Sequence, residues 1–411
     1  MSYFASRLFQ DARVLVGVTG GIAAYKSCEL IRFLVDAGSE VRVMMTESAG
    51  RFITPLTLET LSRNPVFSEL FPDSEFSGTH HINLADWAQA VIVAPATANF
   101  IGKLVNGIAD DFVTTTALAL SCPLVVAPAM NSNMWQHFSV QRNVAQLKEN
   151  DVLICEPEEG FLAEGYHGIG RLARLEYLLQ YLYRALHPEP NSLAGKTVLI
   201  TAGRTEEPLD PARILTNRST GKMGFALAVE AFARGARVVL VHGPTHVIPP
   251  RVDRLVGVQT AQQMLEAVEK HFDQADVFLS AAAVADFRPA SSRPDKIKKE
   301  NSEMSLQLVS NPDILATMGE RKKPRQRLVG FAVETRQGVQ NARKKLEVKN
   351  LDLVVLNNPG EPGAGFAVDT NRVTLLGKAG ERVELPLLSK LDVARAVFEV
   401  LLKGSTDLAN E

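Results

Sequence analysis

The apolar residues of this chain follow two alternating patterns along its first half. Short continuous apolar runs predict buried strands at 14–19, 40–46, 91–96, 123–130 and 152–157. The segments between these runs, such as IAAYKSCELIRFLVDAG at 22–38 and the stretch 135–149, place apolar residues at helical spacing. A regular alternation of strands and helices predicts a parallel sheet with helices on both faces.

The same alternation restarts after a polar break. The segment HPEPNSLAGK at 187–196 separates a helical run from a new strand, and its prolines, Asn, Ser and Gly are typical of a linker. Beyond it, further strands are predicted at 197–203, 237–243, 276–284, 329–335 and 351–360, with helices at 224–235 and 261–272 and a hairpin at 372–386. We therefore expect two Rossmann-like α/β domains, residues 1–190 and 191–411, without a clean tandem repeat between them.

Composition narrows the possible partners and the cellular compartment. The chain has 411 residues, of which 46% are hydrophobic and 22% charged, and its formal net charge is −2. This balance gives no overall field that would attract nucleic acid or a membrane surface. The three cysteines form no CxxC pair, and no apolar run reaches the ~18 residues that a membrane helix needs. We expect a soluble cytoplasmic protein whose partners are small molecules.

Polar residues follow several predicted strands of the first half. GVTGGIAAYK at 17–26 reads as a strand, a glycine pair and a helix start, which suits either a phosphate-bearing ligand or an ordinary tight turn. Its spacing is not GxGxxG, so NAD is not favoured. Thr97, Asn99 and Asn131 also follow strands, where they either face a ligand or cap helices. The spacing of His80 and His81 does not distinguish a structural role from a general base.

Two further segments carry candidate chemistry. GFLAEGYHGIGR at 160–171 has four glycines in twelve residues and predicts a flexible loop that encloses one acid, Glu164. ITAGRTEEPLDPARILTNRSTGKMG at 200–224 predicts a long polar loop between a strand and a helix. Its STGK resembles the end of a phosphate loop, but GxxxxGK[ST] is absent, which excludes a Walker motif.

The first-half motifs GVTGGIAAYK, THHINLADWA, APATANF, GKLVNGIADD and PAMNSNMW, in this order, resemble the flavin-binding cysteine decarboxylases. With the second half, about 400 residues resemble the bacterial bifunctional phosphopantothenoylcysteine decarboxylase/phosphopantothenate–cysteine ligases of coenzyme A synthesis. The resemblance implies a flavodoxin-like three-layer domain that binds FMN. The residues that would help to hold FMN are Gly20, Gly21, Thr46, Thr97 and Asn99. The catalytic histidine would be His81, and the substrate clamp would comprise Asn131 and Met134.

The glycine-rich segment departs from the family pattern. The family loop resembles LACGxxGxGRM, and its cysteine is usually the proton donor, whereas this chain reads LAEGYHGIGRL. Glu164 stands in place of the cysteine, and Leu172 in place of the methionine. A carboxyl has a reference pKa of ~4.3 against ~8.5 for a thiol, so Glu164 could donate a proton at neutral pH only in a site that raises its pKa. Three outcomes stay open: Glu164 is the acid, Tyr166 or His167 replaces it, or the enethiol product is not efficiently reduced.

The second half resembles the CTP-dependent ligase, which activates 4′-phosphopantothenate as an acyl-cytidylate and couples it to cysteine. The resemblance implies that Asn217 handles the acyl-nucleotide, that Lys296 of DKIKK neutralises developing charge and that Asp286 reads cytosine. Further substrate contacts would be Asn311, Pro312, Asp313, Ile314, Phe331, Lys345 and Lys349. Mg²⁺ is implied by the phosphate chemistry, but its ligands are not identified. We interpret the basic run 321–327 as a solvated face, and 363–376 as structural.

The resemblance also implies assembly: trimers of the first domain, dimers of the second and, by combination, a dodecamer. Two other functions remain as alternatives at this stage. One is an NAD(P)-dependent reductase, which a bound yellow chromophore would contradict. The other is a regulatory binding protein, which the complete ligase half disfavours.

Overall fold

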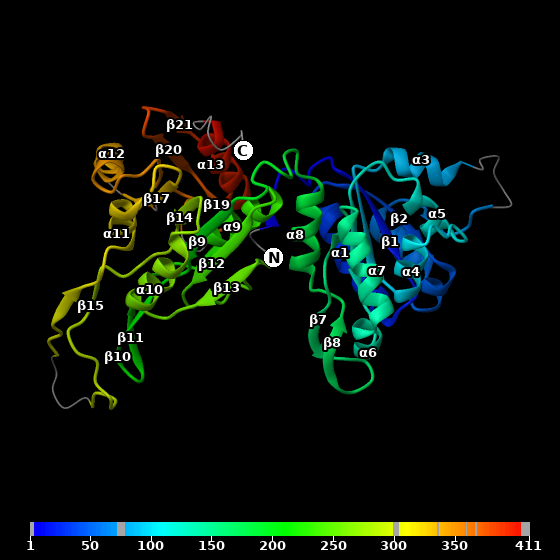
Figure 1. Cartoon of the computed structure of the whole chain (residues 1–411), viewed down its shortest axis with the longest axis horizontal. Helices are drawn as coiled ribbons and strands as arrows, with labels where there is room; N and C mark the ends of the chain where they lie inside the picture. The colour runs from blue at the N-terminus through cyan, green and yellow to red at the C-terminus, as the bar shows by residue number, and fades with distance from the viewer. Residues whose placement is uncertain are drawn as a thin grey trace. The chain divides into compact units, whose positions relative to one another are not determined.

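The computed structural model describes residues 4–71, 79–298, 304–334, 337–358, 360–365 and 368–403 (Figure 1). The described residues fold into two compact units, one of residues 6–188 and the other of residues from 189 onward together with Phe4 and Ala5. Lys299 of the basic motif, Thr335 of a predicted strand and residues 366–367 of the predicted structural segment lie outside the described residues. Within the described part, no helix combines the length and the apolar character needed to cross a membrane.

The sheet of the first unit is parallel and has the strand order β3-β2-β1-β4-β5-β6. Its strands are β1 (Arg13–Val18), β2 (Glu40–Met45), β3 (Val66–Phe67), β4 (Ala90–Ala96), β5 (Leu124–Pro128) and β6 (Leu153–Ile154). β3 is a short edge strand. Without it the order is 2-1-3-4-5, which is the flavodoxin pattern. The predicted flavodoxin-like fold is therefore confirmed.

Helices cover both faces of this sheet, as Figure 1 shows. α1 (Ser27–Asp36), α2 (Pro55–Ser62) and α8 (Leu175–Ala185) pack on one face. The other face carries α3 (His80–Trp87), α4 (Ala98–Val105), α5 (Phe112–Leu118) and α7 (Phe138–Glu149). Short turns of helix occur at η2 (Ile22–Lys26), η3 (Glu47–Arg51) and α6 (Ser132–Gln136). Leu15 and Val126 of the sheet are buried against Phe100 and Phe112 of the second group, as alternate positions of a two-faced sheet require.

The sheet of the second unit has the order β13-β12-β9-β14-β17-β18-β20-β21. Its strands are β9 (Thr197–Ala202), β12 (Arg237–His242), β13 (Arg254–Gly257), β14 (Val277–Ser280), β17 (Arg327–Val333), β18 (Leu353–Asn357), β20 (Val373–Gly377) and β21 (Arg382–Glu384). The order of the parallel strands is 3-2-1-4-5-6, the Rossmann order, and β20 and β21 extend it as an antiparallel hairpin. The Rossmann-like fold and the hairpin are confirmed.

The second unit has helices on both faces of its sheet. α9 (Lys222–Ala233) and α13 (Lys390–Lys403) pack together on one face. On the other, a shared core joins α10 (Ala261–Phe272), α11 (Ile314–Arg321) and α12 (Gly338–Val348). Short antiparallel pairs form outside the main sheet from β10 (Glu206–Asp210) with β11 (Arg213–Thr216), β15 (Phe287–Pro289) with β16 (Leu308–Ser310) and β19 (Thr370–Asn371) with β22 (Leu388–Ser389).

Two segments that the sequence predicted as loops contain hairpins, so both predictions were wrong. In 160–171, β7 (Glu158–Phe161) pairs with β8 (His167–Arg171), and in 200–224, β10 pairs with β11. A strand is predicted from side chains that alternate between two faces, and glycine has no side chain. The glycines at 160, 168 and 170 therefore gave no such alternation, although their backbone forms a strand pair. The predicted helix at 135–149 is also divided, because α6 ends before His137 and α7 begins after it.

Candidate functional site

The first unit has a cavity of about 510 Å³ where the carboxyl ends of β1, β4 and β5 meet the β7–β8 hairpin. Its volume lies in the range of ~300–1,000 Å³ that is usual for small-molecule sites, and its position is where open α/β sheets bind ligands. Residues predicted from the sequence that line it are Gly20, Gly21, Thr97, Asn131, Met134 and Glu164. The fold therefore brings together loops that are far apart in the chain.

Hydrogen bonds hold these loops in place. The Thr19 hydroxyl, at the end of β1, donates to the carbonyl of Pro95 at 2.8 Å and accepts from the backbone N–H of Thr97 at 3.0 Å. The backbone N–H of Met130, after β5, donates to the carbonyl of Gly170 in the hairpin at 3.0 Å. The edge of the cavity is thus fixed by backbone contacts.

Two glycines are required by close backbone approach. A Cβ on Gly20 would lie 2.4 Å from Cβ of Ser48, so the loop after β1 can pack against the loop after β2 only with glycine there. A Cβ on Gly170 would lie 2.1 Å from the carbonyl oxygen of Met130. Both distances are too short for any residue with a Cβ. Glycine at these two positions is therefore required for the close packing of the loops around the cavity.

Asn131 is the centre of a polar cluster at the cavity. Its Oδ1 accepts from the backbone N–H of Asn133 at 2.9 Å, which orients the amide. Its Nδ2 then donates to Oε1 of Glu164 at 3.0 Å and to Oη of Tyr166 at 2.7 Å. Asn131 is also the N-cap residue of α6, so the same side chain caps this helix and contacts the other polar residues of the cluster. Two of the alternative proton donors, Glu164 and Tyr166, therefore meet at Asn131.

The electrostatics of this cluster distinguish the two groups. The hydrogen bond from the Asn131 amide, aided by a backbone hydrogen bond, lowers the pKa of the exposed Glu164 carboxyl below its ordinary value. An ionised carboxylate accepts hydrogen bonds and has no proton to give. Tyr166 is 40% exposed, and its hydroxyl still has its own proton to donate after accepting from Asn131. The ring of His167 instead packs against Phe161, with the ring centroids 5.7 Å apart.

Two of the residues predicted to hold FMN, Thr46 and Asn99, and the predicted catalytic His81 do not line this cavity. Thr46 accepts from the backbone N–H of Ala49 at 3.3 Å and caps η3, beside the Ser48 that contacts Gly20. Asn99 is exposed on α4. His81 is partly buried on α3, the helix that packs against α5. For Thr97, ligand contact and helix capping were the two alternatives, and the structure allows both, because Thr97 lines the cavity and also caps α4.

The second unit has a cavity of about 320 Å³ at the carboxyl ends of its central strands and the start of α9. Two of the residues predicted to contact substrate, Asn217 and Phe331, line it. The Asn217 amide donates to the carbonyls of Ala283 and Val284 at 3.1 and 3.2 Å. The segment predicted to handle the acyl-nucleotide is thereby held against the loop that follows β14.

The remaining predicted substrate contacts of the second unit form a charged cluster near Phe331. Nζ of Lys345 donates to the Phe331 carbonyl at 2.6 Å, and Nζ of Lys349 lies 2.5 Å from Oδ2 of Asp313. Burial would raise the pKa of the Asp313 carboxyl, but hydrogen bonds from Lys349 and the backbone outweigh it and lower that pKa. Burial, and then the charge of Lys349, lower the pKa of Lys345. This cluster suits an anion, which would relieve the repulsion between the lysines.

The loop 311–314 connects this cluster to Asp286. The backbone N–H of Asn311 donates to the Asp286 carbonyl at 2.8 Å, and its amide donates to the Ala285 carbonyl at 2.7 Å. Pro312 follows, Asp313 caps α11, and Ile314 is buried as the first residue of that helix. Asp286 is exposed. The motif NPDI therefore forms the beginning of α11, and its acid, Asp313, pairs with Lys349.

Lys296 does not line the second cavity. Its side chain is exposed, and its loop is held by Ile297, whose N–H donates to Asp210 at 3.1 Å and whose carbonyl accepts from Arg213 at 3.1 Å. The structure therefore does not bring Lys296 together with Asn217 and Phe331 in this cavity.

Sequence reasoning missed two lysines of the second cavity. Nζ of Lys222 lies 2.6 Å from Asp369, and Lys390 is 3% exposed with its ammonium directed at the carbonyls of Gly365 and Val368. Burial and the charge of Lys222 lower the pKa of Lys390 to about 8. Lys390 is the first residue of α13, where a cation is unfavourable because the helix dipole is positive at that end. This unfavourable position could have marked Lys390 as a candidate site residue.

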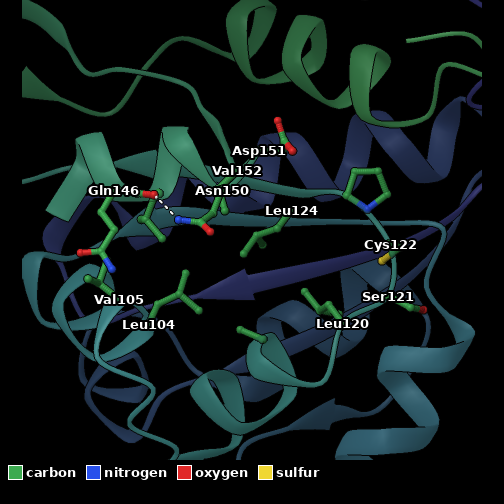
Figure 2. Close-up of a pocket in the computed structure, with 13 residues that line it drawn as sticks. Leu104, Val105, Leu120, Ser121, Cys122, Leu124, Gln146, Asn150, Asp151 and Val152 are labelled. Atoms are coloured by element: carbon green, nitrogen blue, oxygen red, sulfur yellow. Dashed lines mark hydrogen bonds between the residues drawn. The ribbon is translucent and has the colours of Figure 1, made fainter. Parts of the chain in front are cut away.

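A third cavity, of about 590 Å³, lies at the opposite, amino end of the first unit's sheet (Figure 2). Figure 2 shows Leu104, Leu120 and Leu124 on its wall, with Cys122 at one side. Burial raises the pKa of the Cys122 thiol, which disfavours the reactive thiolate. None of the predicted site residues lines this cavity, so it carries none of the expected chemistry.

The predicted Mg²⁺ has no preformed site in the described residues. No group of three or more His, Cys, Asp or Glu side chains in the described ranges is arranged to hold a metal ion. Magnesium usually binds through one or two carboxylates together with the phosphates of its substrate.

Comparison with known proteins assigns the two halves of the chain to two different domain families. Residues 5–187 match the family described as flavoprotein, and residues 193–404 match the DNA/pantothenate metabolism flavoprotein C-terminal domain. The chain is 48% identical over 396 residues to the Coenzyme A biosynthesis bifunctional protein CoaBC of Bacillus subtilis (strain 168), which covers 96% of this chain and 97% of that protein. The chain belongs to this bifunctional coenzyme A biosynthesis family.

Membership confirms the family predicted from the motifs and, with it, the two activities, phosphopantothenoylcysteine decarboxylase and phosphopantothenate–cysteine ligase. Among solved structures, the C-terminal domain of a coenzyme A biosynthesis bifunctional protein CoaBC is 42% identical, covering 52% of this chain and 97% of that chain with a TM-score of 0.45. The FMN-dependent cysteine decarboxylase SpaF is 34% identical, covering 44% of this chain and 99% of that chain with a TM-score of 0.39.

Proposed function

We propose that this enzyme first couples cysteine to 4′-phosphopantothenate with CTP in the second unit, and then decarboxylates the product with FMN in the first. The observation that supports the proposal best is the Asn131 cluster, because it places an oriented amide donor beside a cavity of cofactor size at the carboxyl end of a flavodoxin-like sheet. The three cysteines, Cys28, Cys122 and Cys155, form no disulfide, which suits a reducing cytoplasm.

The residues at the first cavity fit a flavin. Gly20, Gly21 and Thr97 line the same part of the cavity, at the start of η2 and α4, where backbone N–H groups suit a phosphate. Bound FMN would oxidise the thiol-bearing carbon of the substrate and later return the electron pair as hydride. Thr46 and Asn99 flank these loops and complete the set that we propose for flavin binding.

In this proposal Asn131 holds the carboxylate of the substrate through Nδ2, and Met134 covers it. Glu164 already occupies this donor as a carboxylate, so substrate binding displaces it. Loss of CO₂ leaves an enethiolate, and the carbon that carried the carboxylate must then receive a proton. We assign that proton to Tyr166, whose hydroxyl is 2.7 Å from the same amide, rather than to Glu164.

His81 lies on α3, outside the lining of the cavity. We propose that the first unit assembles as a trimer and that His81 serves the cavity of a neighbouring copy. Exposed apolar side chains that suit such an interface are Ile22, Tyr25, Phe52, Leu56 and Ile82. We likewise propose that the second unit pairs as a dimer, so that the full assembly is a dodecamer.

In the second unit, the carboxylate of phosphopantothenate attacks the α-phosphate of CTP and pyrophosphate leaves. The amine of cysteine then attacks the acyl-cytidylate and releases CMP. We propose that Phe331, Lys345 and Lys349 bind the nucleotide and that Asp286 and the loop 311–314 read the base. Asn217 orients the acyl-nucleotide, and Lys296 neutralises charge on the phosphates together with Mg²⁺.

Mass spectrometry of the products made from phosphopantothenate, cysteine, CTP and Mg²⁺ tests both halves. We expect phosphopantothenoylcysteine to appear first and 4′-phosphopantetheine to follow, with a flavin spectrum in the purified protein. Pyrophosphate without any decarboxylated product would contradict the proposal for the first unit. A colourless protein that still reduces substrate with NADPH would contradict FMN.

A further inference from the structure

Two cations lie close to each other in the lining of the first cavity. Lys26, the last residue of η2, and Arg171, the last residue of β8, both line the cavity. Glu158, which is 9% exposed, interacts electrostatically with both cations, and Glu29 also acts on Lys26. Whether Glu158 neutralises these cations decides what this wall can bind.

Glu158 is engaged mainly by another residue. Its carboxylate accepts from the backbone N–H of Arg174 at 2.8 Å and from Nε of Arg174 at 2.6 Å, and the Arg174 Nη2 atom lies 2.6 Å away. The Arg171 guanidinium lies 3.7 Å from the same carboxylate, beyond hydrogen-bond distance. Three cations therefore surround one carboxylate, and Arg174 takes most of its hydrogen-bonding capacity.

Among the described residues, Arg171 has the 3.7 Å ion pair with Glu158, and no side-chain hydrogen bond or ion pair is formed by Lys26. Nε of Arg171 is buried and has no hydrogen-bond acceptor among the described residues. Burial lowers the pKa of Lys26, and the nearby charge of Arg171 lowers it further. A buried guanidinium donor and an ammonium that repel each other are stabilised by an anion placed between them. Within the described part of the chain, the acid that lines the cavity is Glu164, and its carboxylate is bound to Asn131.

We propose that Lys26 and Arg171 form a phosphomonoester subsite of this cavity. A phosphomonoester carries about −1.5 to −2 charge at neutral pH and presents three acceptor oxygens, which match a guanidinium fork and an ammonium together. The inference rests on the proposed decarboxylase function, because that substrate has a phosphate at one end and a carboxylate at the other. The cavity has a cationic wall for the first and the Asn131 amide for the second.

The same chemistry occurs in the 5′-phosphate of FMN, so the experiment separates the two sources. Isothermal titration of the full-length flavin-loaded protein compares 4′-phosphopantetheine with pantetheine. Titration of flavin-free protein compares FMN with riboflavin. The variants are Arg171→Gln and Lys26→Gln, with Arg171→Lys to keep the charge, and Arg32→Gln, an exposed residue of α1, as the matched control. Thermal unfolding of each variant verifies that it is folded.

If the substrate phosphate occupies the subsite, wild-type protein binds phosphopantetheine about 10- to 100-fold more tightly than pantetheine, and Arg171→Gln and Lys26→Gln remove most of that preference. Arg171→Lys retains part of it, and Arg32→Gln retains all of it. If the variants weaken FMN but not riboflavin, the subsite belongs to the cofactor. Variants that change neither preference would overturn the subsite.

Failure of the decarboxylase proposal gives a different result. Neither thiol would then bind the flavin-loaded protein, and the comparison of FMN with riboflavin alone would decide the subsite. Equal binding of both thiols by wild-type protein, with unchanged discrimination between FMN and riboflavin in the variants, would leave the decarboxylase proposal intact and contradict the subsite.

Discussion

The two units place their cavities at the same position of similar folds, yet the chemistry around the cavities differs. In the first unit, an oriented amide at Asn131 adjoins exposed hydroxyl and carboxylate groups, and cations occupy only one wall. In the second, Lys222 and Lys390 enter the cavity, and Lys345 and Lys349 lie beside it. A decarboxylase that relies on flavin needs one well-placed proton and one anchored carboxylate. A ligase must stabilise several phosphates, so lysines dominate. The scaffold therefore fixes where chemistry occurs, and the loops decide which chemistry it is.

The largest expected effect concerns the proton of the first cavity. Tyr166→Phe removes the hydroxyl that we assign as donor, so reduction of the enethiol should slow by about 100-fold or more. CO₂ release should continue. Mass spectrometry should then find the enethiol, lighter than phosphopantetheine by two hydrogens.

Two companion variants make this result specific. Tyr177→Phe removes a hydroxyl from α8 and should leave the product unchanged, while Glu164→Gln should still yield phosphopantetheine. Enethiol from Glu164→Gln, with or without enethiol from Tyr166→Phe, would mean that Glu164 is needed for the proton and would refute the assignment.

The next effect belongs to the second cavity. Lys345→Met removes a partly buried cation from the proposed nucleotide cluster, so KM for CTP should rise by about tenfold or more. Pyrophosphate release measures it. Decarboxylation of added phosphopantothenoylcysteine by the same preparation serves as the internal control, because that reaction uses the other unit. A parallel loss of both activities would indicate misfolding instead of a nucleotide contact.

A smaller, pH-dependent effect should separate the two cavities further. Because the pKa of Lys390 is lowered to about 8, this lysine is charged below pH 8 and becomes neutral as the pH rises through that value. If its charge attracts an anionic substrate, KM for phosphopantothenate should increase several-fold between pH 7 and pH 9. Lys390→Met should have a high KM that hardly changes over this range. An identical pH profile in the variant would show that Lys390 only holds the backbone carbonyls of Gly365 and Val368 in place.

The smallest effect should come from the basic run 321–327. Lys323 is exposed and lies 3.2 Å from Asp273, a surface ion pair of the kind that contributes ~0–1 kcal/mol. Lys323→Gln should leave both activities within about twofold and alter the free energy of unfolding by less than about 0.5 kcal/mol. Urea denaturation and the two assays measure this. A loss of CTP binding would instead place this run in the ligase site.

The periodicity of the chain was sufficient for most of the fold. The buried parts of strands such as 14–18 and 238–241 are continuous apolar runs, and right-handed strand–helix–strand connections restrict their order. The hairpins at 158–171 and 206–216 were not recognised, because glycine and polar residues show no two-residue alternation. Of the site residues, those in loops directly after strands could be predicted, as Gly20, Thr97 and Asn131 show.

The sequence by itself determined the family, the two α/β units and the loops that carry their chemistry, because these depend on local pattern and on motifs read along the chain. Only the tertiary structure decided which side chains meet. Residues 131, 164 and 166 come together because backbone contact between Met130 and Gly170 brings the hairpin to the end of β5. Lys26 and Arg171 are 145 positions apart, and their shared wall follows from the same contact. Protonation also depends on this packing, because hydrogen bonds and burial shift the pKa values of Glu164 and Lys390 in ways that no spacing reveals.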